Sequence, residues 1–114
     1  MNNEEFLGHV SFLMNKFEVA FNDLKKANDQ GRITVTRVSP KELQIKVTKI
    51  GTYRIYADES TQYVYLQSPQ SGLYNYKYDI GNQQWKSEMQ SHIIDELLMR
   101  EFITFTKGTL TLWS

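Results

Sequence analysis

The sequence has 114 residues, a length typical of a single domain, and 40% of them are hydrophobic, which favours a folded core over disorder. It contains no cysteine, which excludes a disulfide scaffold, a thiolate zinc site and a cysteine nucleophile. Thirteen basic and thirteen acidic residues cancel, so no strong net charge attracts nucleic acid or an anionic membrane.

Segment 4–27 has the apolar spacing of an amphipathic helix. Large apolar side chains recur three and four residues apart and form one stripe: Phe6, Val10, Leu13, Phe17, Phe21 and Leu24. We expect Asn2 or Asn3 to cap the helix, whose positive end suits Glu4 and Glu5. Gly31 marks the expected exit from the helix.

After the helix the apolar pattern changes to a period of two residues, which predicts strands. We expect strands at 32–38, 43–49, 52–57, 62–67 and 73–78, with a short sixth strand at 84–86. The segment 39–42, which contains Pro40, is expected to turn the first pair into a hairpin, and Gly51 interrupts the next connection. Strands joined by such short turns pair antiparallel.

A second helix is expected over roughly 91–104. Ser91 is one candidate for its cap, and Ser87 with Gln90 offers an alternative capping box. Ile94, Leu97, Leu98 and Phe102 form its apolar stripe, which Glu101 interrupts. The apolar segment 109–113 is expected to lie against the helices, so 1–114 reads as one domain with a packed tail at 105–114.

The order of helix, strands and helix predicts an α+β two-layer sandwich. Its two terminal helices would pack on one face of a mainly antiparallel sheet of five to seven strands. The other face would then remain open.

Strand alternation predicts which side chains lie on the open face. If Tyr53, Ile55, Val64 and Leu66 are buried, Arg54, Tyr56, Tyr63 and Tyr65 point outward. A cluster of exposed rings is unusual on a monomer, and tyrosine is well suited to protein interfaces. We therefore interpret this face as a contact surface for a partner.

Residues 51–72 resemble the frataxin family, whose members read Gly-Thr-Tyr-x-Ile and then aromatic-Leu-x-Ser-Pro-x-Ser-Gly. The matching residues are Gly51, Thr52, Tyr53 and Ile55, then Tyr65, Leu66, Ser68, Pro69, Ser71 and Gly72. A tryptophan after the next hairpin, Trp85, and a Glu-Leu-Leu helix core at 96–98 also match. The start MNNEEF is similar to that of bacterial members, so the resemblance spans nearly the whole chain and implies a frataxin-like fold.

The resemblance implies an accessory role in iron–sulfur cluster assembly. Family members dock on a complex of a cysteine desulfurase and an iron–sulfur scaffold protein and modulate sulfur transfer. The same role is expected here for a monomer, with no nucleic acid and no membrane among its partners. The expected contact residues are Tyr56, Tyr63, Tyr65, Ser68, Pro69, Ser71, Gly72, Asn75 and Trp85. Trp85 could be core or interface, and the family pattern favours partial exposure.

The chain departs from the family at two surfaces. Tyr65 stands where relatives usually expose a tryptophan, and Asn75 stands where they have Arg or His, which we interpret as an interface adapted to another partner surface. Relatives also bind iron weakly through an acidic ridge on the first helix and first strand. Here that helix carries only Glu4, Glu5, Glu18 and Asp23, and the strand has Arg32 and Arg37. Glu4 and Glu5 remain the best candidates for weak iron binding.

Two other functions remain open. An iron-oxidising or iron-storing protein, a ferroxidase, needs clustered carboxylates, which are scarce here. Single-stranded nucleic acid could stack on an aromatic sheet face, but neutral charge and the absence of an RNA-recognition signature disfavour this. His9 and His92, on different predicted helices, favour no metal pair, and Asp58 with Glu59 reads as a solvated turn. No catalytic residue can be assigned.

Localisation is predicted mainly from the resemblance. No segment is long and apolar enough to span a bilayer, and the start lacks the features of a secretory signal, so either the protein acts where it is made or a presequence is missing or cryptic. The Ser-Pro-x-Ser-Gly form is similar to that of mitochondrial relatives. We expect the matrix of a mitochondrion or a mitochondrion-derived organelle, with the bacterial cytoplasm as the alternative.

Overall fold

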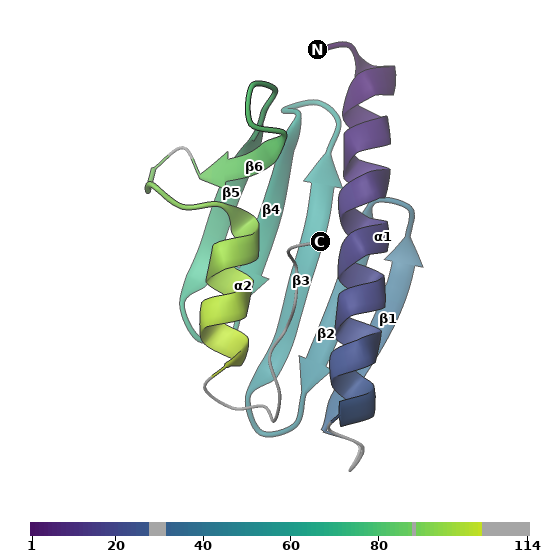
Figure 1. Cartoon of the computed structure of the whole chain (residues 1–114), viewed down its shortest axis with the longest axis vertical. Helices are drawn as coiled ribbons and strands as arrows, with labels where there is room; N and C mark the ends of the chain where they lie inside the picture. Colours follow the sequence, from purple (N-terminus) through teal and green to yellow (C-terminus); the bar gives the residue numbers. More distant parts are fainter. Residues whose placement is uncertain (28–31, 88, 104–114) are drawn as a thin grey trace.

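Two helices lie on one face of an antiparallel sheet in the computed structural model, which describes residues 1–27, 32–87 and 89–103 (Figure 1). The described elements are α1 (Asn3–Ala27), β1 (Ile33–Ser39), β2 (Glu42–Val47), β3 (Gly51–Asp58), β4 (Tyr63–Ser68), β5 (Gly72–Asp79), β6 (Gln84–Ser87) and α2 (Ile94–Phe102). The six strands follow one another in the sheet in chain order, and every neighbouring pair is antiparallel. The predicted α+β sandwich is therefore confirmed.

Helix α1 forms where the spacing predicts it. The Asn2 side-chain oxygen accepts a hydrogen bond from the Glu5 backbone N–H at 2.8 Å, so Asn2 is the cap. All six residues of the predicted stripe are buried, together with Met14. The predicted exit at Gly31 lies outside the described residues.

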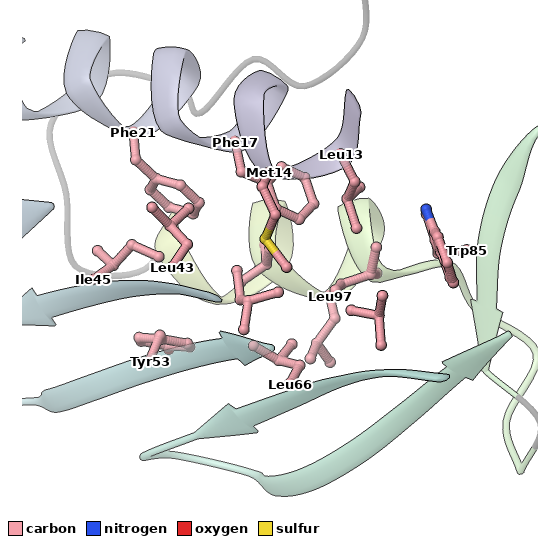
Figure 2. Packing of buried hydrophobic residues seen from close by; sticks show 14 of the residues in the cluster. Leu13, Met14, Phe17, Phe21, Leu43, Ile45, Tyr53, Leu66, Trp85 and Leu97 are labelled. Atoms are coloured by element: carbon pink, nitrogen blue, oxygen red, sulfur yellow. The ribbon is translucent and has the colours of Figure 1, made fainter. Parts of the chain in front are cut away.

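The core fills the space between the helices and the sheet. Figure 2 shows Leu13, Met14, Phe17 and Phe21 of α1 projecting toward the strands. The ring of Phe102 on α2 lies 4.8 Å, between centroids, from both Phe21 and Tyr53, so it joins the two helices to β3. Burying these large apolar side chains is the main favourable contribution to folding.

Helix α2 is shorter than predicted. It begins at Ile94 after Ile93, an N-cap residue with extended backbone and no side-chain capping bond, so both predicted caps are wrong. Backbone bonds explain the late start, because the Ser87 N–H donates to the His92 carbonyl and Lys86 forms a bridge with Ile93. These bonds hold His92 and the extended Ile93 against β6. The predicted tail at 105–114 lies outside the described residues.

Neither described helix is of a length and apolarity that would let it cross a bilayer.

Candidate functional site

The uncovered face of the sheet carries the predicted cluster of tyrosines. Tyr53 and Ile55 of β3, and Val64 and Leu66 of β4, are fully buried on the helix side. Arg54, Tyr56, Tyr63 and Tyr65 alternate with them and are partly exposed. The alternation therefore predicted the outward side chains correctly.

These outward side chains are stacked on one another. The Arg54 guanidinium lies 4.2 Å from the centroid of the Tyr56 ring. The Tyr56 and Tyr65 rings are 5.3 Å apart and 21° from parallel, and Tyr63 meets Tyr65 edge to face at 6.1 Å. Aromatic stacking and a cation over a ring both favour fixed orientations, so the four side chains form an ordered surface. We call them the aromatic face.

The Arg54–Glu42 ion pair and the register of the strands fix where the side chains of the aromatic face lie. Glu42 accepts a hydrogen bond from Arg54 Nε at 2.7 Å, and this bond is the largest cause of the lowered pKa of Glu42. In the sheet register Tyr56 lies opposite both Glu42 and Tyr65, and Tyr65 lies opposite Asn75. Three of the predicted partner residues, Tyr56, Tyr65 and Asn75, thus form one row across the strands.

The corner between β4 and β5 is braced from below by Glu101. The Ser68 hydroxyl donates to Glu101 at 2.7 Å, the Ser71 hydroxyl donates to the same carboxylate, and Tyr53 donates to it at 2.7 Å. Ser68 also accepts hydrogen bonds from the Gln70 and Ser71 backbone N–H groups. Ser68 is only 4% exposed, so here its hydroxyl holds the corner from inside, and its contact with a partner stays a prediction.

The exposed side of the corner consists of Pro69, Gln70, Ser71 and Gly72. Gly51, at φ 130°, lies under Pro69, and a Cβ on Gly51 would come within 2.7 Å of the Pro69 Cβ. Only glycine combines this backbone conformation with so close an approach. The two halves of the family signature, Gly-Thr-Tyr and Ser-Pro-x-Ser-Gly, are therefore in contact.

Trp85 does not lie on the uncovered face. It is 3% exposed and packs edge-on against Phe6 and Tyr78, with centroid distances of 5.8 and 5.1 Å. Partial exposure at the partner surface was therefore a wrong prediction. Trp85 instead lines a pocket of about 490 Å³ on the helix side, where Lys16 forms an ion pair of 2.6 Å with the buried Asp95.

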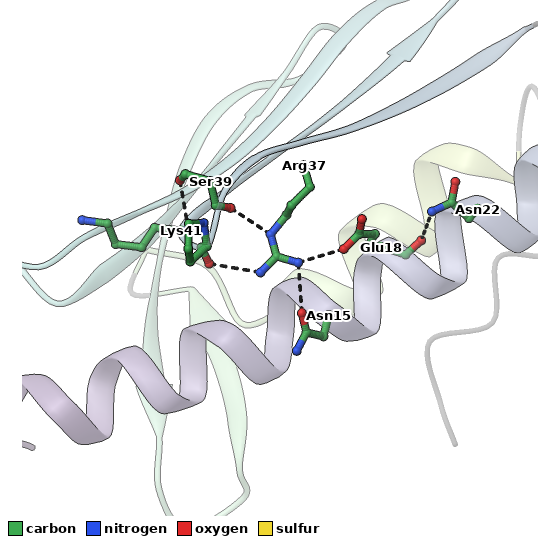
Figure 3. A network of polar contacts seen from close by, with 7 residues as sticks. Asn15, Glu18, Asn22, Arg37, Ser39 and Lys41 are labelled. Atoms are coloured by element: carbon green, nitrogen blue, oxygen red, sulfur yellow. Dashed lines mark hydrogen bonds and ion pairs between the residues drawn. The ribbon is translucent and has the colours of Figure 1, made fainter.

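The carboxylates of α1 are not gathered into a metal site. Arg37 of β1 donates to Glu18 at 2.9 Å, to the Asn15 side chain at 3.0 Å and to two backbone carbonyls of the β1–β2 turn (Figure 3). This network pairs Glu18, one of the four acidic residues of α1, with a cation. Within residues 1–27, 32–87 and 89–103, no three His, Cys, Asp or Glu side chains are close enough to hold a metal ion. Weak binding at the exposed Glu4 and Glu5 remains a prediction.

The other polar candidates have structural partners. Glu59 accepts hydrogen bonds from Lys41 at 2.6 Å and from Asn3 at 2.9 Å, and the Lys41 bond is the largest cause of its lowered pKa. His9 stacks on Tyr78 with ring centroids 3.9 Å apart. His92 precedes α2 instead of lying in its first turn, and its ring nitrogen lies 2.8 Å from the Tyr76 hydroxyl. Burial is the largest cause of the lowered pKa of His92.

The structure thus defines a two-layer α+β protein whose uncovered sheet face carries stacked tyrosines beside a braced Ser-Pro-Gln-Ser-Gly corner. A family model described as "Frataxin-like domain" matches residues 1–108, and the chain belongs to this family. A comparison with curated protein sequences found no match.

Solved frataxin structures share the fold. Frataxin from Psychromonas ingrahamii matches with a TM-score of 0.79 and 16% identity, covering 100% of both chains. Trimeric frataxin from the yeast Saccharomyces cerevisiae, complexed with ferrous iron, matches with a TM-score of 0.74 and 18% identity, covering 88% of this chain and 87% of that one. The yeast trimer with its full-length N-terminus matches with a TM-score of 0.71 and 21% identity, covering 84% of this chain and 77% of that one.

Proposed function

We propose that this protein is an accessory factor of iron–sulfur cluster assembly that binds a cysteine desulfurase–scaffold complex through the aromatic face. Membership of the frataxin-like family supports the process. The observation that carries the mode of action is the stack of Arg54, Tyr56 and Tyr65 on the uncovered side of the sheet. The protein would act on the partner enzyme by binding it, without a catalytic group of its own.

The geometry of the aromatic face suits tight association. Tyrosine side chains bury much area for few rotatable bonds, and rings that already stack lose little further freedom on binding. Energetic hot spots of interfaces are enriched in Tyr and Arg near the centre of the contact. Tyr65 has this position, because it contacts both Tyr56 and Tyr63 and lies opposite Asn75.

The proposed contact does not include Glu4 or Glu5, the candidates for iron binding. A related yeast protein has been crystallised with ferrous iron, and we expect iron to bind this chain only weakly, at Glu4 and Glu5. The ridge position at Glu18 is already paired with Arg37. An iron-oxidising function would need a carboxylate cluster, and no described residues form one. For the compartment we propose the matrix of a mitochondrion or a related organelle, on the resemblance of the Ser-Pro corner to mitochondrial relatives.

The proposal is tested by binding and sulfide release with a desulfurase–scaffold complex, with and without ferrous iron. Tyr65→Ala should weaken binding by about tenfold to thirtyfold, because it removes a central ring. Tyr65→Phe, which keeps the ring, and Thr34→Ala, an exposed residue of β1, should bind as the wild type does. Unchanged binding of folded Tyr65→Ala would contradict the proposal.

A further inference from the structure

Two lysines lie opposite each other at one end of the uncovered sheet face. In the register Tyr63 of β4 pairs with Lys77 of β5, and Lys77 pairs with Lys86 of β6. Both lysines are exposed. Tyr63 meets Tyr65 edge to face, so this lysine pair continues the aromatic face toward the edge of the sheet.

Neither lysine belongs to an ion pair within the described part of the chain. The described ion pairs join Lys16 to Asp95, Arg37 to Glu18, Lys41 to Glu59 and Arg54 to Glu42, and none includes Lys77 or Lys86. Asp79, two residues beyond Lys77, uses its carboxylate in the β5–β6 turn, where it accepts hydrogen bonds from Gly81 and Asn82. Lys86 lies close enough to Asp79 for its charge to help lower the pKa of that carboxyl, although this is the smallest of the causes.

A like-charge pair directly across two strands is unfavourable for folding. Lysines commonly protect a sheet edge from pairing with other chains, but here the edge beyond β6 is already occupied. Lys86 forms a bridge with Ile93, and the Ser87 N–H donates to the His92 carbonyl. Edge protection therefore does not account for two facing lysines, whereas binding of an anionic group would.

We infer that Tyr63, Lys77 and Lys86 form a docking surface for an acidic segment of a partner protein, one in which carboxylates flank an apolar or aromatic side chain. The inference deepens the proposed function and rests on it for the identity of the partner. Carboxylates would pair with the two ammonium groups while the adjoining side chain packs on Tyr63. Nucleic acid fits less well, because it needs a longer track of cations than two lysines.

The chemistry is tested first on the protein alone, by backbone-amide NMR titration. The probe is an acetylated peptide in which glutamates flank a phenylalanine, and the control peptide has glutamines in their place. We expect saturable shifts at Tyr63, Lys77 and Lys86 with the acidic peptide only. The shifts should be lost in Lys77→Gln/Lys86→Gln and kept in Lys46→Gln, a single exposed lysine elsewhere on the same face.

Several results would overturn the inference. They are the absence of a saturable shift, an equal response to the glutamine peptide, and shifts that persist in the double variant. If an oligothymidylate of similar length binds more tightly than the acidic peptide, the surface binds nucleic acid and not an acidic protein segment.

A second measurement uses the desulfurase–scaffold complex over a range of salt concentrations. The double variant should bind about fivefold more weakly at low salt, mainly through slower association, and its affinity should depend less on salt. If Tyr65→Ala loses binding while the double variant keeps wild-type affinity and salt dependence, this inference is wrong and the proposed function stands. If the wild type does not bind the complex, the proposed function is wrong, and the peptide titration decides the inference alone.

Discussion

The two faces of the sheet use the same residue type in opposite ways. On the covered face Tyr53 and Tyr76 are fully buried, and their hydroxyls lie 2.7 Å from Glu101 and 2.8 Å from His92. Burial raises the pKa of both phenols, so they stay protonated. On the uncovered face Tyr56 and Tyr65 stack mainly on each other and remain partly exposed.

The role of a tyrosine in this sheet therefore depends on which face its position in the strand points to. A buried hydroxyl needs a hydrogen-bond partner, and its ring area has already been used in folding. An outward ring keeps much of its area for a second event, which is association. Mutations on the two faces should therefore separate stability from binding.

The largest expected effect is on the covered face. Tyr76→Ala should lower the free energy of unfolding by about 3–5 kcal/mol, because it leaves a cavity and removes the partner of His92. Tyr65→Ala should cost only about 0.5–1.5 kcal/mol, the value of a partly exposed aromatic contact. Urea unfolding of the two variants measures both values. Equal losses would break the comparison between the faces.

A smaller loss is expected at Glu101, which connects the covered face to the corner. Glu101→Gln should cost about 2 kcal/mol, because the amide group cannot accept from the three hydroxyls of Tyr53, Ser68 and Ser71 as a carboxylate does. Hydrogen exchange of the corner amides of Gln70 and Ser71 should also become faster.

The matched control for that substitution is Glu96→Gln, because Glu96 is an exposed residue of the same helix. It should change neither the unfolding free energy nor the exchange at the corner. If both variants behave alike, Glu101 does not brace the corner.

The strands, the first helix and the outward tyrosines could be predicted from the sequence because they follow from the period of the apolar residues. In a long element this period recurs several times, so it is easy to detect. The sequence left Trp85 open between core and interface because β6 has four residues, too few for alternation to show which side is covered. Only the register, which places Trp85 opposite Tyr78, shows its side of the sheet. The family pattern supplied the wrong expectation of exposure.

Tertiary contacts account for the other features that the sequence does not predict. The sequence does not show that Ser68 and Glu101 are partners, because their mutual hydrogen bond joins positions 33 residues apart. One signal was available in the sequence: Glu101 lies within the apolar stripe of α2, and a carboxylate at such a position needs hydrogen-bond donors from elsewhere in the chain. The late start of α2 likewise depends on backbone bonds to β6 that no local propensity contains.

The smallest expected effect is a pH dependence of the free energy of unfolding that arises from His92, the partner of Tyr76 on the covered face. His92 has a pKa below its usual value, mainly through burial, with the Arg100 charge adding to the shift and Glu96 opposing it. Below about pH 6.5 the unfolded chain binds a proton at His92 more readily than the folded chain does. The free energy of unfolding therefore decreases as the pH is lowered from about 6.5, until the pH passes the lower pKa of the folded state. Urea unfolding at about pH 7.5, 6.5 and 5.5 should show this decline in the wild type but not in His92→Gln, which keeps a hydrogen-bonding group near Tyr76. Carboxylates that are stabilised in the folded state lose their contribution at lower pH, so an identical decline in both proteins would show that His92 does not titrate as its burial requires.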